Sequence, residues 1–294
     1  MREQIADALK GHEADYIEIH FERSQSTGMV YQGNRLEEIG RTSVRGGNVR
    51  ALVRGSWGFA SFDGFDGLRE KVALAVMEAR LAGGGEAWFS SAEPVVDKVS
   101  WSPRKYASRV VLASKKQLLD NYNDIILSSP GIQSSAINYR DVQRTTIFAN
   151  SDGSYIEQEK PDLSLRITAI ASGEGKVRQA GLSLGSRGDF TEIEGLEDQV
   201  RDVARRAEAL LYAPQLKGGE YTVILDPVLA GVFTHEAFGH LSESDFVYQN
   251  KGLRQLMALG RRFGDKGLNI VDDATTPGLR GSYKYDDEGT PGAK

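Results

Sequence analysis

The segment His235-Glu236-Ala237-Phe238-Gly239-His240 combines two imidazole side chains and one carboxylate within six residues. Two histidines and a nearby glutamate are the groups with which zinc hydrolases hold a metal ion and place a general base beside the coordinated water. The chain contains four histidines, and two of them lie in this segment. The candidate chemistry is therefore metal ligation by His235 and His240, with Glu236 as the catalytic base.

The two histidines are five residues apart, whereas the common zinc-protease motif places them four apart. On a regular helix, side chains five residues apart point about 140° away from each other and cannot both reach one ion. A wide turn of the π type brings residues i and i+5 to one face, and such turns occur often at functional sites. A metal site here therefore predicts a locally widened helix over 235–240. Gly239, which lacks a Cβ, is expected to ease that distortion.

Small and apolar residues precede the motif, in the run Val228-Leu229-Ala230-Gly231-Val232-Phe233. This composition predicts a buried helix, and adjacent ionisable groups in a buried helix need a partner or a function. Glu243 and Asp245 follow closely, and Glu243 in particular could accept a hydrogen bond from a ligating histidine. The alternative is an amphipathic helix with one packed and one exposed histidine, followed by a solvated acidic end.

Other polar clusters give weaker indications of a site. His12 and His20 are expected at the surface or beside a strand. The run Asp286-Asp287-Glu288 is interpreted as a solvated acidic turn rather than as a site for a hard cation. The glycine-rich stretches lack the strand–loop–helix context and the lysine of a phosphate-binding loop, so they are interpreted as turns.

Composition restricts the class of protein. The 294 residues are 40% hydrophobic and 26% charged, as in globular proteins, and suffice for one large or two ordinary domains. The net charge of −5 gives no basis for binding nucleic acid, and no apolar run approaches the roughly 18 residues of a membrane-spanning helix. Cysteine is absent and no apolar signal core follows Met1, so we expect a cytoplasmic protein. Its own metal ligands are then limited to His, Asp and Glu.

Periodicity predicts an α+β fold with antiparallel or mixed sheets and long helices. Apolar residues at helical spacing indicate helices over 2–10, 67–82, 109–127 and 196–212. Alternating and β-branched stretches indicate strands over 16–22, two within 28–39, and others over 48–53, 57–62, 132–140, 142–149 and 163–171. Turn signals occur at Gly33-Asn34 and at Asn150-Ser151-Asp152-Gly153.

A linker over 214–219 divides the chain into a domain of residues 1–215 and a domain of residues 216–294. The second domain is expected to open with a buried strand at 221–225 and a helix capped by Asp226, with Pro227 in its first turn. About 75 residues are few for a catalytic domain with its own core, and the sequence stops within a series of turns. The chain is therefore expected to be truncated, its second domain to be incomplete, and the isolated chain to aggregate or oligomerise.

Motifs spread over the whole chain resemble the TldD/PmbA family, also described as modulators of DNA gyrase, and its TldD branch in particular. The specific part is His235-Glu236-x-x-x-His240 followed by Glu243 and Asp245. Further stretches similar to the family are Ala14-Asp15-Tyr16-Ile17-Glu18-Ile19, Gly33-Asn34-Arg35-Leu36-Glu37, Val49-Arg50, Gly55-Ser56-Trp57-Gly58-Phe59-Ala60 and Asp286-Asp287-Glu288-Gly289-Thr290-Pro291-Gly292.

The resemblance implies a zinc metallopeptidase that works as a heterodimer with a PmbA-like (TldE-like) subunit and hydrolyses unfolded or short peptides in an enclosed cavity. His235 and His240 match the two zinc ligands of the family motif, and Glu236 matches its general base. The third protein ligand in the family is a cysteine from the C-terminal half, a residue type that this sequence lacks. Family members are longer, in agreement with the truncation expected above.

The function that we expect is a zinc-dependent peptidase subunit in which Glu236 activates a zinc-bound water and delivers the proton to the leaving amine. The alternative is a non-catalytic binding or structural subunit of a TldD/PmbA-type heteromer, in which the histidines are merely packed. A hydrolase of non-peptide amides is a third interpretation, which the sequence does not separate from a peptidase.

Overall fold

The computed structural model describes residues 1–87 and 92–294 and divides them into two compact units. The first unit contains residues 1–213 together with residues 274–293, which we call the C-terminal strap. The second unit contains residues 214–273 together with Lys294. The division at 213/214 lies close to the predicted linker. The strap packs within the first unit, although it follows the predicted linker in the sequence.

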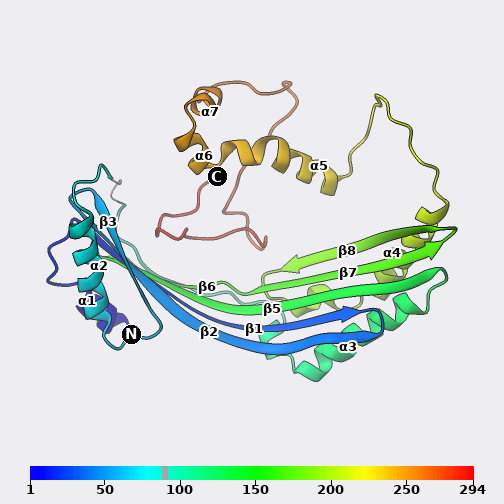
Figure 1. The fold of residues 1–294 in the computed structure, drawn as a ribbon, viewed down its shortest axis with the longest axis horizontal. Coiled ribbons are helices and arrows are strands. Elements are labelled where there is room, and N and C mark those ends of the chain that lie inside the picture. The colour runs from blue at the N-terminus through cyan, green and yellow to red at the C-terminus, as the bar shows by residue number, and fades with distance from the viewer. Residues whose placement is uncertain (88–91) are drawn as a thin grey trace. The chain divides into compact units, whose positions relative to one another are not determined.

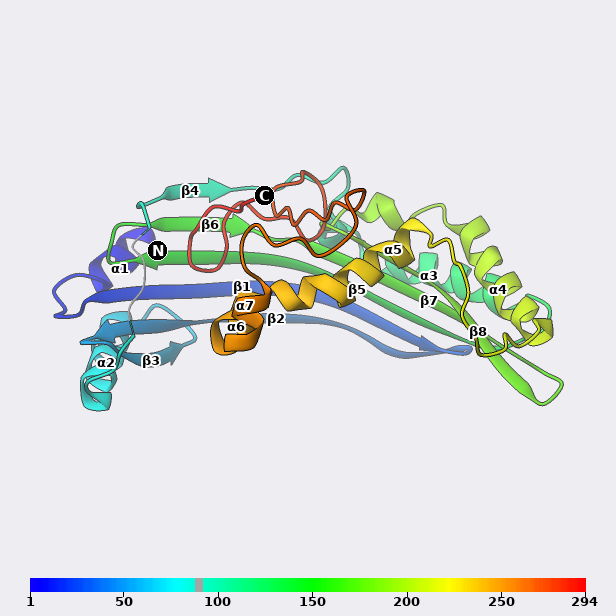
Figure 2. The same ribbon diagram turned by 90° about the horizontal axis from the view of Figure 1, so that it is seen from above.

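The described part of the first unit is built on one eight-stranded sheet (Figure 1). Its strands are β1 (Tyr16–Gln32), β2 (Arg35–Val53), β3 (Ser56–Phe62), β4 (Val96–Val99), β5 (Ile132–Asn150), β6 (Tyr155–Glu159), β7 (Asp162–Gly173) and β8 (Lys176–Ser186). They follow the order β3-β2-β1-β5-β6-β4, while β7 pairs with another stretch of β5 and β8 pairs with β7. The β4–β6 pair, which lies at one edge (Figure 2), is parallel, and the others described are antiparallel.

Helices cover one face of this sheet in two groups, because the strands are long enough to carry both. The helices α1 (Arg2–Ala8) and α2 (Leu68–Ala82) share a core with Ile19 of β1. The helices α3 (Leu112–Leu127) and α4 (Glu197–Tyr212) share a core with Met29 of the same strand. Side chains alternate along a strand, so these two odd-numbered residues point to the same face. Both groups of helices therefore lie on one side of the sheet.

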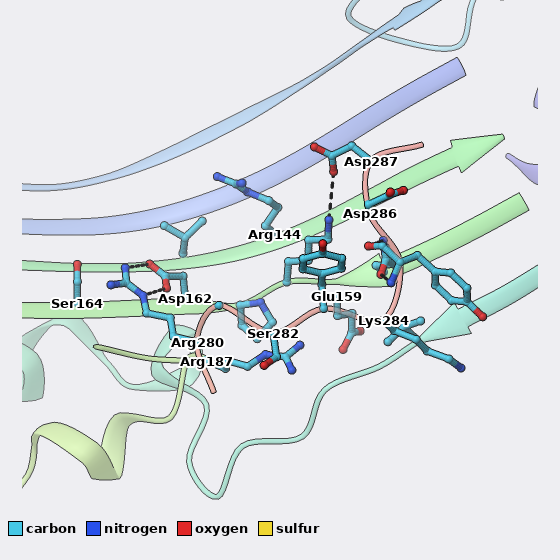
Figure 3. Close-up of a pocket in the computed structure, with 18 of the residues that line it drawn as sticks. Arg144, Glu159, Asp162, Ser164, Arg187, Arg280, Ser282, Lys284, Asp286 and Asp287 are labelled. Atoms are coloured by element: carbon cyan, nitrogen blue, oxygen red, sulfur yellow. Dashed lines mark hydrogen bonds and ion pairs between the residues drawn. The ribbon is translucent and has the colours of Figure 1, made fainter. Parts of the chain in front are cut away.

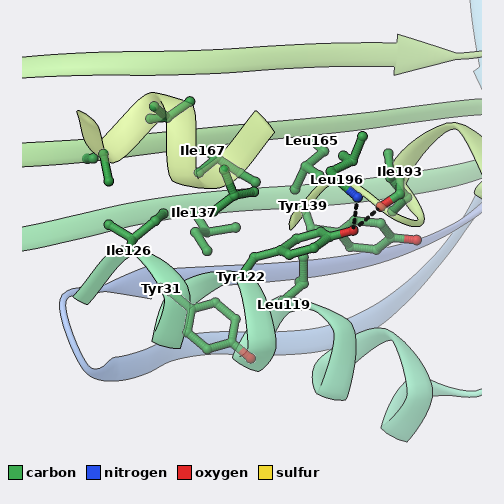
Figure 4. Packing of buried hydrophobic residues seen from close by; sticks show 14 of the residues in the cluster. Tyr31, Leu119, Tyr122, Ile126, Ile137, Tyr139, Leu165, Ile167, Ile193 and Leu196 are labelled. Carbon is green, nitrogen blue, oxygen red and sulfur yellow. Dashed lines mark hydrogen bonds between the residues drawn. The ribbon is translucent and has the colours of Figure 1, made fainter. Parts of the chain in front are cut away.

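An apolar core fills the space between the sheet and the helices α3 and α4 (Figure 4). The hydroxyl of Tyr122, a residue of α3 that is completely buried, lies within this core. It donates to the backbone oxygen of Ile193 at 2.7 Å and accepts a hydrogen bond from the backbone N–H of Leu196 at 3.2 Å. Because buried polar groups need hydrogen-bond partners, this pair of bonds fixes α3 against the segment that leads into α4.

A buried ion pair joins α3 to the sheet. The Lys115 ammonium donates to Asp141 of β5 at 2.5 Å, and the two side chains are 0% and 3% exposed. Burial lowers the pKa of Lys115, although its hydrogen bond with Asp141 opposes that shift. The Tyr139 hydroxyl donates to the same oxygen of Asp141 at 2.6 Å. Such additional hydrogen bonds are what a buried ion pair needs to offset the loss of hydration.

The C-terminal strap lies on the face of the sheet opposite the helices. Its Tyr285 is buried against Phe148 of β5, which pairs directly across from the even-numbered His20 of β1 and so points away from the helices. Arg280 of the strap donates two hydrogen bonds to the carboxylate of Asp162, at 2.5 and 2.7 Å. A bidentate arginine–carboxylate pair has a defined geometry, so the strap has a fixed register on the sheet.

The predicted α+β fold class is confirmed, since the first unit combines a mainly antiparallel sheet with long helices. The helices predicted over 2–10, 67–82, 109–127 and 196–212 are present, as are both predicted turns. The strands are longer than predicted, because neighbouring stretches join into the continuous β1, β2 and β5. The strands β4, β6 and β8 are absent from the prediction. In β8, glycine, serine and charged residues hide the alternation.

The second unit consists of short helices and turns, namely α5 (Pro227–Thr234), α6 (Ser244–Gln249) and α7 (Lys251–Leu256) among other turns. The prediction of a buried strand at 221–225 is wrong, since these residues form no strand and Ile224 is 100% exposed. A β-branched run forms a strand where a neighbouring strand offers backbone hydrogen-bond partners. Residues 214–273, all of which the structure describes, contain no strand that could be such a neighbour. Among the described residues of the chain, no helix combines the length and the apolar composition that crossing a membrane requires.

Candidate metal centre

The helix that carries the histidine motif begins where the sequence predicts. Asp226 caps α5, because its Oδ1 accepts a hydrogen bond from the backbone N–H of Leu229 at 2.7 Å, and Pro227 occupies the first turn. The first backbone N–H groups of a helix have no partner within the helix. The Asp226 side chain accepts a hydrogen bond from one of them, and Pro227 has no N–H that needs a partner. The helix then runs through apolar residues to Thr234, immediately before the first histidine.

At the motif the helix widens into a π turn over His235–Gly239, and a 3-10 turn continues over His240–Ser242. The widened helix that the five-residue spacing predicts is therefore confirmed. One potential ligand atom from each of His235, Glu236 and His240 lies within 4.8 Å of the other two. The centroids of the two imidazole rings are 4.4 Å apart. The three potential ligand atoms thus gather at one place on the turn, as a site for a single ion requires.

Gly239 does not ease the distortion of the helix, contrary to the prediction. Its φ of −55° lies in the right-handed helical region, which any residue adopts. A Cβ at this position would approach no atom more closely than Nδ1 of His235, at 3.5 Å, which is an ordinary contact. The widened turn therefore does not depend on the missing side chain, and nothing in the structure explains the glycine here.

Glu243 follows the 3-10 turn and forms a hydrogen bond with His240, with 2.5 Å between Oε1 and Nδ1. The other ring nitrogen, Nε2, lies 3.7 Å from Oε2 of Glu236. The hydrogen bond with Glu243 raises the pKa of His240 above its ordinary value. A carboxylate on one ring nitrogen fixes the tautomer and orientation of a histidine that ligates through the other. Asp245, in α6, forms no hydrogen bond or ion pair with these side chains in the described chain.

The motif is exposed, and the prediction of a buried helix is wrong in this respect. The side chains of Glu236 and His240 are 64% and 49% exposed. Val228 and Phe233, which belong to the apolar run before the motif, are 78% and 61% exposed. The physical reason is that residues 214–273 supply no second layer against which α5 could pack. The donor atoms are consequently open to ions and to ligands from solution.

The chemistry of the donor set fits zinc. Imidazole nitrogens and carboxylate oxygens are zinc ligands, and catalytic zinc sites use three protein ligands and leave a fourth position for water or substrate. In the described chain, no further His, Asp or Glu joins His235, Glu236 and His240 in this cluster, and cysteine is absent from the sequence. If Glu236 acts as a base, a third protein ligand has to come from outside the cluster.

His20 and the acidic run interact with charged groups of the first unit, whereas His12 forms a hydrogen bond with the backbone oxygen of Ala8 at 3.1 Å. The buried carboxylate of Glu18 accepts hydrogen bonds from Nε2 of His20, at 2.9 Å, and from Arg50. Arg50 also lies 3.5 Å from Glu288, a residue of the acidic run in the strap. The run is exposed, as the predicted solvated turn requires, since the side chains of Asp287 and Glu288 are 90% and 71% exposed. These two carboxylates also pair with Lys160 and Arg50 of the first unit.

Comparison with families of known proteins matches most of the chain to one family. Family sequence models match residues 17–79 as PmbA/TldA metallopeptidase domain 1 and residues 105–211 as the central domain of that metallopeptidase. A third matches residues 218–294 as its C-terminal domain. The histidine motif lies within the last of these ranges.

Individual relatives agree with this match. A metalloprotease of Synechocystis sp. is 39% identical over 281 residues, which cover 95% of this chain and 61% of that protein. A zinc metalloprotease TldD homolog of Saccharolobus solfataricus is 33% identical over 165 residues, which cover 55% of this chain and 37% of that protein. The solved structure of TldE from Thermococcus kodakarensis matches with a TM-score of 0.71 at 18% identity, covering 99% of this chain and 65% of that one. This last likeness shows a shared fold.

Proposed function

We propose, from the premise that this chain belongs to the PmbA/TldD family of metallopeptidases, that residues 235–240 form the metal-binding part of a zinc-dependent peptidase site. The observation that carries the proposal is the π turn, which draws the potential ligand atoms of His235, Glu236 and His240 within 4.8 Å of one another. The name of the Saccharolobus relative, a zinc metalloprotease, supports the choice of metal.

Each side chain of the motif has a separate role in this proposal. His235 and His240 would hold the ion, with Glu243 orienting the ring of His240 through Nδ1. Zinc, when bound, lowers the pKa of a coordinated water to about 7 and polarises the carbonyl of a substrate. Glu236 accepts the proton that the water gives up and delivers it to the leaving amine. Its exposed carboxylate, 3.7 Å from Nε2 of His240, is close enough to the ligands to serve the same reacting group.

The substrates that we propose are unfolded or short peptides, hydrolysed by an assembly with a TldE-like subunit. The exposure of the motif supports access by an extended chain. The fold shared with TldE from Thermococcus kodakarensis supports a partner built on the same architecture. The chain spans 61% of the length of its Synechocystis relative. We therefore propose the peptidase activity for a whole protein of this family. Its third zinc ligand would be a cysteine, as the family resemblance implies.

The test replaces Glu236 by glutamine in the protein assembled with a TldE-like subunit. Glu236→Gln keeps the shape of the side chain but cannot accept a proton, so we expect near-normal zinc content and a turnover of fluorogenic peptides reduced about 10²- to 10⁴-fold. His240→Ala should lose both zinc and turnover, because it removes a ligand. The measurements are elemental analysis and steady-state peptide hydrolysis.

Glu220→Gln is the matched control, since Glu220 is an exposed glutamate of the same unit outside the cluster. It should leave zinc content and turnover unchanged. Near-normal cleavage by Glu236→Gln would show that Glu236 is structural. An assembly that forms normally but neither holds zinc nor cleaves peptides would favour the non-catalytic subunit.

A further inference from the structure

A pocket of the first unit contains arginines that the proposed peptidase site does not use. Its volume is about 760 Å³, within the range of small-molecule and short-peptide sites. It lies between the sheet and the C-terminal strap, and Figure 3 shows side chains from both, such as Arg144 from the sheet and Arg280 from the strap. Every residue that lines it belongs to the first unit, so the pocket exists independently of the second unit.

The cations of this pocket fall into two classes. Most of them have a carboxylate partner: the pairs are Arg280 with Asp162, Lys284 with Asp97, Lys160 with Asp287, and Arg144 with Glu22. Arg140 and Arg187 are different, because neither forms an ion pair with any residue that the structure describes. Two guanidinium groups of the pocket therefore lack a counter-ion.

The strands around Arg140 explain why it has no partner. Arg140 lies in the middle of β5, directly across from Gly28 of β1 and from Ser164 of β7. Gly28 has no side chain, and the Ser164 hydroxyl forms no hydrogen bond within the described residues. Both cross-strand neighbours are uncharged, so the guanidinium donors of Arg140 and the hydroxyl of Ser164 remain available to a ligand.

Arg187 is held in place by an aromatic ring. Its guanidinium lies 4.1 Å from the centroid of the Trp101 ring, and Nε1 of Trp101 donates to the backbone oxygen of Arg187 at 2.8 Å. The side chain is half-buried, and burial lowers its pKa with no carboxylate to oppose the shift. A guanidinium that is stacked, partly dehydrated and without a counter-ion is prepared to receive a planar anion.

We infer that this pocket binds the carboxylate of an acidic or short peptide, with Arg140 and Arg187 as its recognition residues. A guanidinium donates two parallel hydrogen bonds to a carboxylate, which suits both side chains. The pocket is also lined by carboxylates, namely Glu159, Asp162, Asp286 and Asp287. These disfavour a doubly charged phosphate and leave a singly charged carboxylate as the better ligand. The choice of peptides as carriers of that carboxylate rests on the proposed function.

Calorimetric titration of the full chain with three capped dipeptides tests this inference. Acetyl-Glu-Glu-amide offers side-chain carboxylates, acetyl-Gln-Gln with a free C-terminus offers a terminal carboxylate, and acetyl-Gln-Gln-amide offers none. We expect one or both carboxylate-bearing peptides to bind at least about tenfold more tightly than the uncharged one, as one charge-assisted pair requires. The titrations are run with 1,10-phenanthroline, an uncharged chelator, so that binding does not depend on zinc. Failure here is then distinguishable from failure of the peptidase proposal.

Variants assign the binding to the two arginines. Arg140→Gln and Arg187→Gln should each weaken binding about tenfold, and Arg140→Lys, which keeps the charge but loses the planar donors, should have an intermediate effect. The control Arg178→Gln removes an exposed arginine of β8 outside the pocket and should change nothing. Circular dichroism verifies that each variant is folded.

Three results would overturn the inference. The first is equal affinity for the uncharged and the carboxylate-bearing peptides. The second is unchanged affinity in both Arg140→Gln and Arg187→Gln. The third is displacement of the acidic peptide by an equal concentration of inorganic phosphate, which would show a general anion site instead of a carboxylate site.

Discussion

The two units of the chain use apolar residues in opposite ways. In the first unit, Ile19 of β1 and Val72 of α2 are completely buried. In the second, α5 contains no charged residue and is more apolar than α2, yet Val228 and Phe233 are 78% and 61% exposed. The sheet gives each helix of the first unit a face to cover, whereas residues 214–273 contain no strand and no second layer. The first unit therefore provides most of the buried apolar contacts that stabilise the chain, whereas the proposed peptidase residues lie in the second unit.

The largest effect is expected when the buried ion pair of the first unit is broken. Lys115→Met leaves the carboxylate of Asp141 without its cation at a site that is 3% exposed, which should lower the free energy of unfolding by about 3–5 kcal/mol. Urea unfolding followed by far-UV circular dichroism measures this change. Lys116→Met, one residue along and 43% exposed, should change it by less than about 0.5 kcal/mol.

A second variant tests the cause of that effect. Lys115→Met combined with Asp141→Leu and Tyr139→Phe removes both charges and the buried hydroxyl that would lose its acceptor, so we expect it to recover most of the lost stability. Equal effects of Lys115→Met and Lys116→Met would show that the ion pair does not stabilise the first unit, and the contrast between the units would then rest on apolar packing alone.

A smaller effect is expected from acid, through Asp189 of the first unit. Burial acts to raise the pKa of this carboxyl, but hydrogen bonds from Thr191 and Arg104 outweigh it and lower the pKa to about 2. The stabilisation is therefore fully present above the ordinary pKa of about 3.9 and is lost as the pH falls through about 2. Asp189→Asn should cost roughly 1 kcal/mol at pH 6, because it removes the charge that accepts hydrogen bonds from Thr191 and Arg104. It should also reduce the loss of stability between pH 5 and pH 2.

Urea unfolding at a series of pH values measures this dependence. The control is Asp198→Asn, because the side chain of Asp198 is 100% exposed. If both variants keep the same pH dependence as the unmodified protein, Asp189 does not carry the acid sensitivity of the first unit.

The smallest effect on stability is expected in the second unit. Phe233→Ser should change the free energy of unfolding by less than about 0.5 kcal/mol, because the ring is 61% exposed. The same substitution should reduce concentration-dependent light scattering, since exposed apolar patches promote association. Phe21→Ser, at a ring of the first unit that is 5% exposed, is the destabilising counterpart. A loss of several kcal/mol in Phe233→Ser would mean that the second unit packs a core in solution.

Features that depend on neighbouring residues could be predicted from the sequence. The cap at Asp226, the turn at Gly33-Asn34 and the widened helix at 235–240 each follow from a few consecutive residues, and the structure contains all three. Burial could not be predicted in the same way. The run 221–225 has the composition of a core strand, but a strand also needs a partner that the run itself cannot specify.

Contacts between distant parts of the chain were also beyond prediction. The strap packs against strands that precede it by more than a hundred residues, as Tyr285 does against Phe148. Arg140 lacks a counter-ion only because Gly28 and Ser164 face it across the sheet. No spacing pattern in the sequence marks such an arrangement, since it depends on the register of three strands.

The C-terminal strap reduces the conformational freedom of the segment before it. Ala213 and Ala274 both belong to the first unit, so residues 214–273 form a loop whose two ends are held by the same folded unit. Closing a flexible loop costs conformational entropy that grows slowly with length, by about 0.6 kcal/mol for each doubling. Folding of the first unit already removes this part of the entropy. An ion or a partner that binds His235 and His240 therefore restricts fewer conformations than it would in a tail with one free end.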